Sequence, residues 1–455
     1  MTTLTTAEAR DSLASAGTVH LPGDPGYDAA RLPWNVTVDQ RPAAVAEPAD
    51  AAEVAAVVRA ARAAGLRVAP QSTGHNAGPL AAHGLGDVVL LRTHRMRGVE
   101  IDPERRVARV LGGSLAIDVV EAAAAHGLAV LHGSSPDVGF AGLAVGGGTF
   151  LYGRKLGLAS NSVIAVELVT ADGELVRASA TENADLFWAV RGGGGSFGVV
   201  TALEVRLFPL PDVQAGLMLW DASRARDVLR AWARWAPDAP EEITTTLRLL
   251  RVPPLPELPE FLRGRHALVI DGAVLGTDER AAEILAPLRA LEPELDTFAR
   301  VPATAVARLH MDPEGPTPAV SASTTIDVLP DAAVDSLLAA SDRAPGLMVI
   351  ELRQLGGAMG RTAEGSGALG ELPGQFLAYA VAVAPTPEDA PRGHEEATAV
   401  MTALAPWATG RQYLSFTETA VDPSTGYDPD AWARLQAIRA TVDPDRVFAA
   451  NHPVA

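Results

Sequence analysis

The chain has 455 residues, 48% hydrophobic and 20% charged, a composition typical of a globular protein with more than one hydrophobic core. Its formal net charge of −18 disfavours nucleic acids and anionic membrane surfaces as partners. Because cysteine is absent, disulfides, thiolate metal sites and cysteine nucleophiles are excluded.

The N-terminal residues MTTLTTAEARDSL lack the basic start and apolar core of a secretory signal. No run of 18 apolar residues follows, so no membrane span is predicted. We therefore expect a cytoplasmic monomer or homodimer that binds neither membranes nor nucleic acids. Most of the histidines, His310 among them, have no partners at metal-ligand spacing, and no metal site is predicted.

Short strands and helices alternate between residues 41 and 209. The clearest helix runs from Asp50 to Ala64, where Asp50 and Glu53 have the spacing of a capping box and Gly65 ends the helix. Its valines and alanines recur on one face, as expected for a helix packed against a core. Strands are also predicted at 66–70, 88–91 and 106–110, and a helix at 114–126.

The pattern changes after Pro209 and Pro211. Strands are predicted near 213–220, 243–251, 266–275, 321–328, 347–353 and 376–384. Amphipathic helices are predicted near 222–236, 278–290, 331–341 and 387–404. The tail is expected to hold a strand at 412–416 and a helix at 430–440.

Glycine-rich segments indicate close approach of the backbone to a ligand. Residues 133–148 contain six glycines in an otherwise apolar context, unlike a flexible linker. The glycine cluster at 192–198 taken alone is more typical of a tight turn, and it does not open a long helix as a Rossmann fingerprint does. Neither Ser135 nor Ser196 lies in a G-x-S-x-G elbow, which argues against a serine hydrolase.

Taken together, four segments resemble the FAD-linked oxidoreductases of the vanillyl-alcohol oxidase and p-cresol methylhydroxylase superfamily, in the berberine-bridge-enzyme-like branch. These segments are the strand and loop 68–76, the loop 135–142 with 146–148, the segment 183–201, and the C-terminal segments 443–448 and 451–453. The likeness covers nearly the whole chain, although it is weak over the middle.

The resemblance implies an α+β fold with three parts. An FAD-binding domain of the p-cresol methylhydroxylase type would comprise residues 1–209. A substrate domain at 210–410 would carry an antiparallel sheet backed by helices, and residues 411–455 would return to the FAD domain. The active site would lie between the sheet and the isoalloxazine ring.

The resemblance also implies one FAD bonded to the imidazole of His75. Bicovalent relatives carry a second-loop cysteine where this chain has Ser135, so one bond at most is expected. The predicted FAD-contacting residues are Gln71, Ser72, Thr73, Gly74, His75, Asn76, Ser134, Ser135, Val138, Gly139, Gly142, Leu143, Gly146, Gly147, Val199, Val200 and Asn451.

By the same resemblance, a base takes a proton from a small organic substrate, hydride passes to flavin N5, and dioxygen is the final acceptor. Tyr413 is the first choice for the base, because Gln412–Phe416 resembles the family's Tyr-x-Asn strand with Ser415 in place of Asn. Tyr379 and Glu351 are alternatives. Glu351 and Arg353 are two apart on a predicted strand, so they form either a salt bridge or a base and a substrate clamp.

The substrate class stays open at this point. A natural-product alcohol is favoured, and a carbohydrate is the alternative. The same fold also allows an FAD protein that catalyses a non-redox elimination or group transfer, or one that binds flavin without catalysis.

Overall fold

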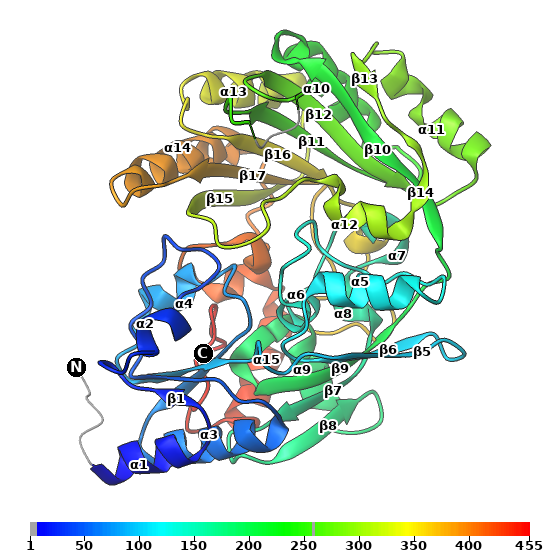
Figure 1. Cartoon of the computed structure of the whole chain (residues 1–455). Coiled ribbons are helices and arrows are strands. Elements are labelled where there is room, and N and C mark those ends of the chain that lie inside the picture. Colours follow the sequence, from blue (N-terminus) through cyan, green and yellow to red (C-terminus); the bar gives the residue numbers. More distant parts are fainter. Residues whose placement is uncertain (1–6, 257–259) are drawn as a thin grey trace.

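The computed structural model describes residues 7–256 and 260–455, so the first six residues of the predicted FAD domain lie outside it. Figure 1 shows two tiers, a lower one built on two smaller sheets and an upper one built on a single large sheet. The predicted α+β class is confirmed, including the antiparallel sheet backed by helices. Within the described residues, no helix combines the length and apolar character needed to cross a membrane.

The first small sheet has the strand order β1(Val19–His20), β2(Ala44–Ala46), β4(Val88–Arg92), β3(Arg67–Gln71). Helix α3(Ala51–Ala63) packs its valines against this sheet. The Asp50 carboxylate caps the helix by accepting from the N–H groups of Ala52 and Glu53. Glu53 accepts from Ala49 N, one residue before the cap, so the predicted capping box is shifted by one position.

The second small sheet is antiparallel, with the order β5(Val99–Asp102), β6(Val107–Leu111), β9(Val199–Arg206), β7(Val163–Val169), β8(Leu175–Ser179). Helices α5(Ala116–Ala124), α6(Phe140–Val145) and α9(Ala184–Gly193) share its hydrophobic core. Helix α5 is shorter than the predicted helix 114–126, because Leu115 is extended and caps its N-terminal end.

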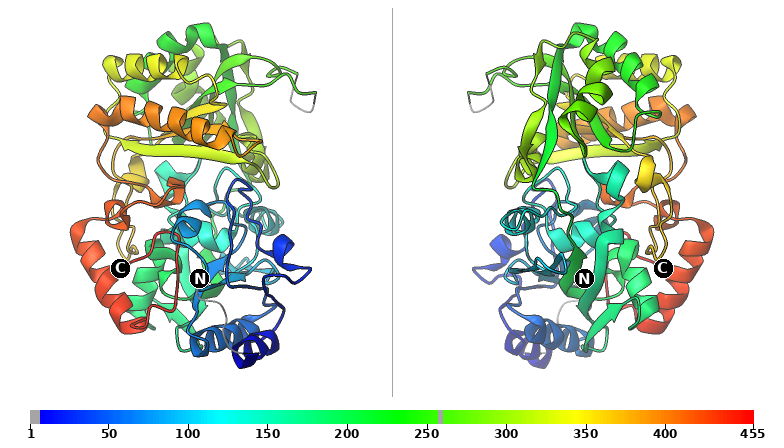
Figure 2. Two further views of the ribbon diagram at one scale, coloured as in Figure 1. Left: turned by 90° about the vertical axis from the view of Figure 1, so that its left-hand side faces the viewer. Right: turned by 90° about the vertical axis from the view of Figure 1, so that its right-hand side faces the viewer.

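The large sheet has eight antiparallel strands. Seven of them follow the order β13(Leu295–Asp296), β10(Asp212–Asp221), β12(His266–Val274), β11(Ile243–Arg251), β16(Val349–Gln354), β17(Phe376–Val383), β15(Ala319–Ile326). The eighth, β14(Ala299–Pro302), also pairs with β10. Helices α10(Ala225–Trp235), α11(Asp278–Arg289), α13(Asp331–Asp342) and α14(Asp389–Leu404) cover the upper face (Figures 1 and 2). The lower face is turned toward the lower tier.

Alternation along the strands separates these two faces. On β16, Ile350 and Leu352 join the core beneath the helices, whereas Glu351 and Arg353 point to the opposite side. The same alternation places Phe376, Ala378, Ala380 and Ala382 of β17 on the helix side. One face of the large sheet is therefore a hydrophobic core, and the other is free to line a site.

The C-terminal segment runs back along the lower tier (Figure 1). Helix α15(Pro429–Val442) is two residues longer at its C-terminal end than predicted. The strand predicted at 412–416 is wrong, because Leu414–Phe416 forms a single 3₁₀ turn, η6. Phe416 N donates to the carbonyl of Tyr413 at 2.9 Å, and the turn stacks the two rings 5.6 Å apart.

Asp443 explains part of the C-terminal motif and generates a prediction. Its buried carboxylate accepts from the N–H groups of Val447 and Phe448 at 2.8 and 3.0 Å and lies 3.4 Å from the Arg439 guanidinium. Asp443→Ala leaves these donors buried without a partner, so the free energy of unfolding should fall by about 2–4 kcal/mol in denaturant titrations.

Asp445→Ala is the matched control, because Asp445 makes an exposed ion pair with Arg62. That change should cost less than about 1 kcal/mol. Equal losses in the two variants would contradict the structural role assigned to Asp443.

Candidate active site

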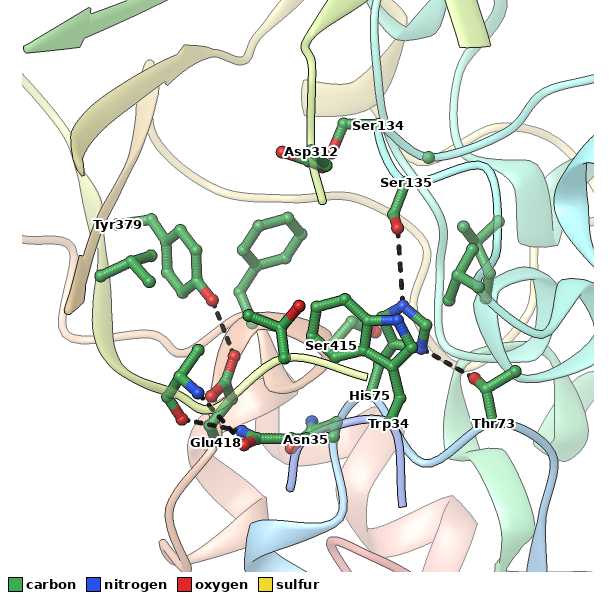
Figure 3. Close-up of a pocket in the computed structure, with 18 of the residues that line it drawn as sticks. Trp34, Asn35, Thr73, His75, Ser134, Ser135, Asp312, Tyr379, Ser415 and Glu418 are labelled. Atoms are coloured by element: carbon green, nitrogen blue, oxygen red, sulfur yellow. Dashed lines mark hydrogen bonds between the residues drawn. The ribbon is translucent and has the colours of Figure 1, made fainter. Parts of the chain in front are cut away.

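A cavity of about 890 Å³ lies between the lower tier and the free face of the large sheet (Figure 3). Ligand pockets commonly have volumes of roughly 300–1,000 Å³. All four predicted catalytic residues line this cavity. So do most of the predicted FAD-contacting residues, namely Gln71, Ser72, Thr73, Gly74, His75, Asn76, Ser134, Ser135, Val138, Gly139, Gly142, Leu143, Gly146 and Asn451.

Three predicted contacts are not among the residues that line the cavity in the described part of the chain. Val199 is fully buried in the core beneath α3, and Val200 packs against the core of the second small sheet. Both lie on β9, whose side chains pack against helices and neighbouring strands. Gly147 lies just behind the lining, where its carbonyl accepts from Ser160 N at 2.8 Å.

The His75 imidazole is held on several sides (Figure 3). Its Nδ1 lies 2.8 Å from the Thr73 hydroxyl, and its Nε2 lies 3.3 Å from an Asp137 oxygen and 3.5 Å from the Ser135 hydroxyl. The ring stacks on Trp34 with centroids 4.1 Å apart and planes 16° apart. The histidine therefore has one orientation that three separate chain segments define.

Asp137 connects these segments. Its carboxylate accepts from Trp34 Nε1 at 2.8 Å, from Gly315 N at 2.7 Å and from the Ser135 hydroxyl at 2.8 Å. Burial raises the pKa of Asp137, but these hydrogen bonds and the one from His75 outweigh burial and hold it well below its usual range. An ionised carboxylate favours the tautomer of His75 with the proton on Nε2, in which the Nδ1 lone pair accepts from the Thr73 hydroxyl.

The residues around His75 fit a long polar ligand such as FAD. Three buried polar atoms of the lining, Ser72 Oγ, Asn76 Oδ1 and His452 Nδ1, have no hydrogen-bond partner within the described residues. A Cβ added to Gly142 or Gly194 would meet no atom within 4 Å, so both glycines border open space. Side chains at these two positions would occupy the volume that a ligand needs.

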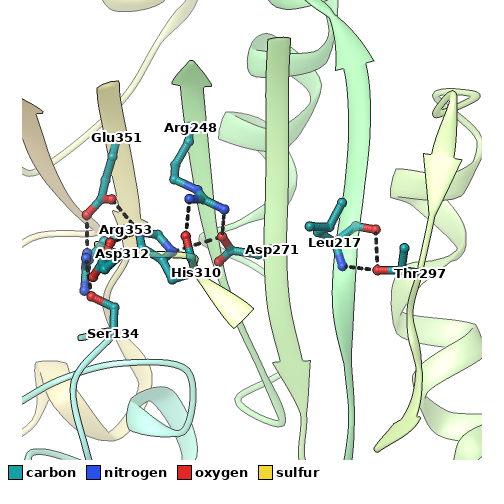
Figure 4. Close-up of polar contacts among 9 residues, drawn as sticks. All are labelled: Ser134, Leu217, Arg248, Asp271, Thr297, His310, Asp312, Glu351 and Arg353. Atoms are coloured by element: carbon teal, nitrogen blue, oxygen red, sulfur yellow. Dashed lines mark hydrogen bonds and ion pairs between the residues drawn. The ribbon is translucent and has the colours of Figure 1, made fainter. Parts of the chain in front are cut away.

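The opposite wall carries buried charges (Figure 4). Glu351 accepts from Arg353 and, at 2.8 Å, from His310 Nε2, while Arg353 donates to the Ser134 hydroxyl at 3.0 Å. Burial raises the pKa of Glu351, but the charges of Arg353 and His310 outweigh it and keep the carboxyl ionised. Glu351 and Arg353 are therefore a salt bridge and also part of the cavity wall.

The charged network continues across the sheet through His310. Its Nδ1 donates to Asp271 at 3.0 Å, and Asp271 lies 2.6 Å from the Arg248 guanidinium (Figure 4). Burial and Arg248 lower the pKa of His310, but Asp271, Asp312 and Glu351 together raise it above its usual value. Both ring nitrogens of His310 therefore face carboxylates, which favour its protonated form.

Sequence analysis missed this network and treated His310 as ordinary. One signal was available, because Asp271 is the single charged residue within the apolar strand 267–274. Arg248 interrupts 243–250 in the same way. A charge inside a strand of uncharged residues indicates a buried partner. Nothing in the sequence pattern marks His310 itself.

Tyr379 donates to the half-buried Glu418 at 2.7 Å (Figure 3). Burial raises the pKa of Glu418 more than the hydrogen bond from Tyr379 lowers it. Burial and the neighbouring Glu418 raise the pKa of Tyr379 well above its usual value. Both shifts therefore favour the protonated forms of this pair.

Tyr413 also lines the cavity and is almost fully buried; its ring and that of Tyr379 both pack against Phe416, with centroids 5.6 and 5.2 Å away. Burial raises the pKa of its phenol to about 12, and the charge of Arg353 acts in the opposite direction. Ser415, the residue that replaces the family's Asn, donates from its hydroxyl to the carbonyl of Gly146 at 2.7 Å. The turn at 414–416 is thereby fixed to the glycine-rich loop.

Comparison with known proteins agrees with this site. The family described as FAD binding domain matches residues 42–179. (R)-6-hydroxynicotine oxidase of Paenarthrobacter nicotinovorans is 42% identical over 212 residues, which are 46% of this chain and 46% of that protein. Glucooligosaccharide oxidase of Sarocladium strictum is 34% identical over 215 residues, 46% of this chain and 43% of that protein. The matches thus span about half the length of these curated relatives.

Solved structures extend the likeness to nearly the whole chain. The structure of 6-hydroxy-D-nicotine oxidase from Arthrobacter nicotinovorans is 28% identical, with a TM-score of 0.81 over 95% of this chain and 96% of that chain. Residues 42–179 of the chain thus match the FAD-binding family, and nearly the whole chain shares the fold of this oxidase. A berberine-bridge-enzyme-like protein of Physcomitrella patens shares the fold, with a TM-score of 0.85 at 22% identity over 98% of this chain and 99% of that one.

The raised pKa of Glu418 generates a prediction about stability. Above about pH 4.5 the unfolded carboxyl ionises, while the folded one keeps its proton to a higher pH, so Glu418 should make the wild type less stable as the pH rises through this range. Glu418→Gln removes this loss of stability and keeps a hydrogen-bond acceptor for Tyr379. Its unfolding temperature relative to wild type should therefore rise between pH 4.5 and pH 7.5.

The matched control is Glu364→Gln, at an exposed position. Its unfolding temperature relative to wild type should not change with pH. If the Glu418→Gln difference is equally flat, the raised pKa of Glu418 is refuted.

Proposed function

We propose that this protein is an FAD-dependent oxidase that holds its flavin by one covalent bond to His75 and oxidises a small organic molecule. The observation that carries the proposal is the cavity itself. His75 and the glycine-rich loops form one wall, and the paired polar side chains of the large sheet form the other. The named activities of the two curated relatives, both oxidases, support it.

Bound FAD would supply a two-electron acceptor that dioxygen can reoxidise with release of hydrogen peroxide. Ser72, Asn76 and His452 would meet its polar groups with their free atoms. Trp34, Thr73 and Asp137 would orient His75 toward the ring. Ser135 lies beside His75, and a serine hydroxyl is a far poorer nucleophile than a thiolate, so a single bond is expected.

Tyr413 remains the proposed base, because it lies at the cavity close to Arg353, whose charge favours the phenolate. Tyr379 is a weaker candidate, since the proton of its phenol is held by Glu418. Glu351 is engaged by Arg353 and His310, which makes it a better partner for Arg353 than a proton acceptor. A non-redox reaction on the same fold is the alternative to oxidation.

The covalent bond to His75 is directly testable. Protein purified from cells should be yellow and should keep its flavin through acid precipitation. His75→Ala should release all of its flavin in acid, while the glycine loops keep part of the FAD bound before denaturation. Thr441→Ala, at an exposed position of α15, is the control and should behave as wild type. Release of all flavin from the wild type would disprove the tether but not FAD binding.

The role of Tyr413 is tested by rapid kinetics. Tyr413→Phe should slow flavin reduction by substrate by about 10²–10⁴-fold, the usual contribution of a general base, and leave reoxidation by dioxygen unchanged. Tyr152→Phe is the control, because Tyr152 is also buried but is not among the residues that line the cavity. Unchanged reduction in the Tyr413 variant would transfer the role to Tyr379 or Glu351.

A further inference from the structure

The free face of the large sheet presents its side chains in rows that run across the strands. Strand pairing places Glu351 opposite Arg248 on one side and opposite Tyr379 on the other. The next row on the same face, two residues along each strand, places Val349 opposite Leu250 and Val381. All six side chains line the cavity. The wall therefore has a charged row, made by Arg248, Glu351 and Tyr379. An aliphatic row, made by Leu250, Val349 and Val381, lies two residues further along each strand.

The charged row has little hydrogen-bonding capacity left for a ligand. Glu351 is bound by Arg353 and by His310, as described above. Arg248 forms an ion pair with Asp271 and donates to the His310 carbonyl at 2.6 Å, and its remaining donors are buried away from the cavity surface. The Tyr379 hydroxyl donates its hydrogen bond to Glu418. These groups can orient one polar group of a ligand, but they cannot satisfy many.

The aliphatic row is continued by further apolar residues of the lining. These are Val252, Leu255, Leu262, Met311, Leu347, Met348 and Val383. Three of them, Leu255, Met311 and Val383, are 51%, 38% and 36% exposed. Large hydrophobic side chains exposed around a cavity indicate a surface that a ligand covers.

We propose that the substrate is a compact, mainly apolar molecule with one oxidisable alcohol or amine group. That group would meet the charged row, and the apolar body would lie against Leu250, Val349 and Val381, which would determine specificity. A carbohydrate would place several hydroxyls against methyl groups, and each unpaired hydroxyl weakens binding by roughly ten- to a hundredfold. This inference rests on the proposed function and favours a nicotine-like rather than a sugar-like substrate.

The apolar wall can be tested without knowing the substrate. The holoprotein is titrated under anaerobic conditions with straight-chain alcohols from butanol to heptanol, with the corresponding alkylamines and with cellobiose, and binding is read from the flavin absorbance spectrum. Affinity should rise about three- to fourfold with each added methylene in at least one of the two alkyl series. The series that binds more tightly identifies the reacting group as an alcohol or an amine.

A variant tests the residues named. Val349→Thr combined with Val381→Thr keeps the shape of the row but adds hydroxyls, and it should weaken binding of the six-carbon member of the tighter series by about tenfold. Val328→Thr is the matched control, since Val328 is exposed and lies outside the cavity lining. Flavin content and unfolding temperature verify that each variant is folded. If the double variant unfolds, Leu250→Met at the same row should leave the methylene dependence intact.

The outcomes separate this proposal from the proposed function. Flat alkyl series, or cellobiose binding at least as tightly as the alkyl ligands, would overturn the apolar substrate even if the protein holds FAD. A protein that holds no FAD would overturn the proposed function instead. In that case the same titrations are followed by tryptophan fluorescence, because Trp34 lines the cavity. The same results then support or contradict the binding of apolar ligands to the aliphatic row.

Discussion

The buried charges on the free face of the large sheet must offset one another, and this constraint organises the site. Asp271, His310 and Glu351 come from separate segments and form one hydrogen-bonded network. The guanidinium groups of Arg248 and Arg353 lie at its two ends. Removing one partner would leave the others buried and uncompensated, a change that typically costs several kcal/mol. This network therefore fixes the positions of the strands and of the segment that carries His310.

That segment also reaches the lower tier. Gly315 N donates to Asp137, and Thr317 exchanges backbone hydrogen bonds with Trp34 and Val36. Arg353 makes a second connection through the Ser134 hydroxyl. The surroundings of His75 and the charged wall are thus parts of one continuous polar structure around the cavity, which explains how two tiers with separate cores present a single site.

Local sequence patterns predicted the elements better than the site. The strands near 243–251 and 376–384 were recognised because they are short runs rich in β-branched, aromatic and other apolar residues, and α3 because its cap and apolar face are encoded within a few residues. The charged wall was not predicted, since His310 meets Asp271 and Glu351 only through long-range folding. The turn at Tyr413 was mistaken for a strand because its contacts with the glycine loop are equally distant in sequence.

The central claim is that the space between His75 and the charged row holds the flavin ring and the substrate. A crystal structure of the protein purified with FAD tests this most directly. We predict continuous electron density from the His75 imidazole into the isoalloxazine, with the ring lying between the Ser135 loop and the side chains of Tyr413 and Arg353. Density that places the ring elsewhere, or leaves His75 unattached and turned away from it, would contradict the claim.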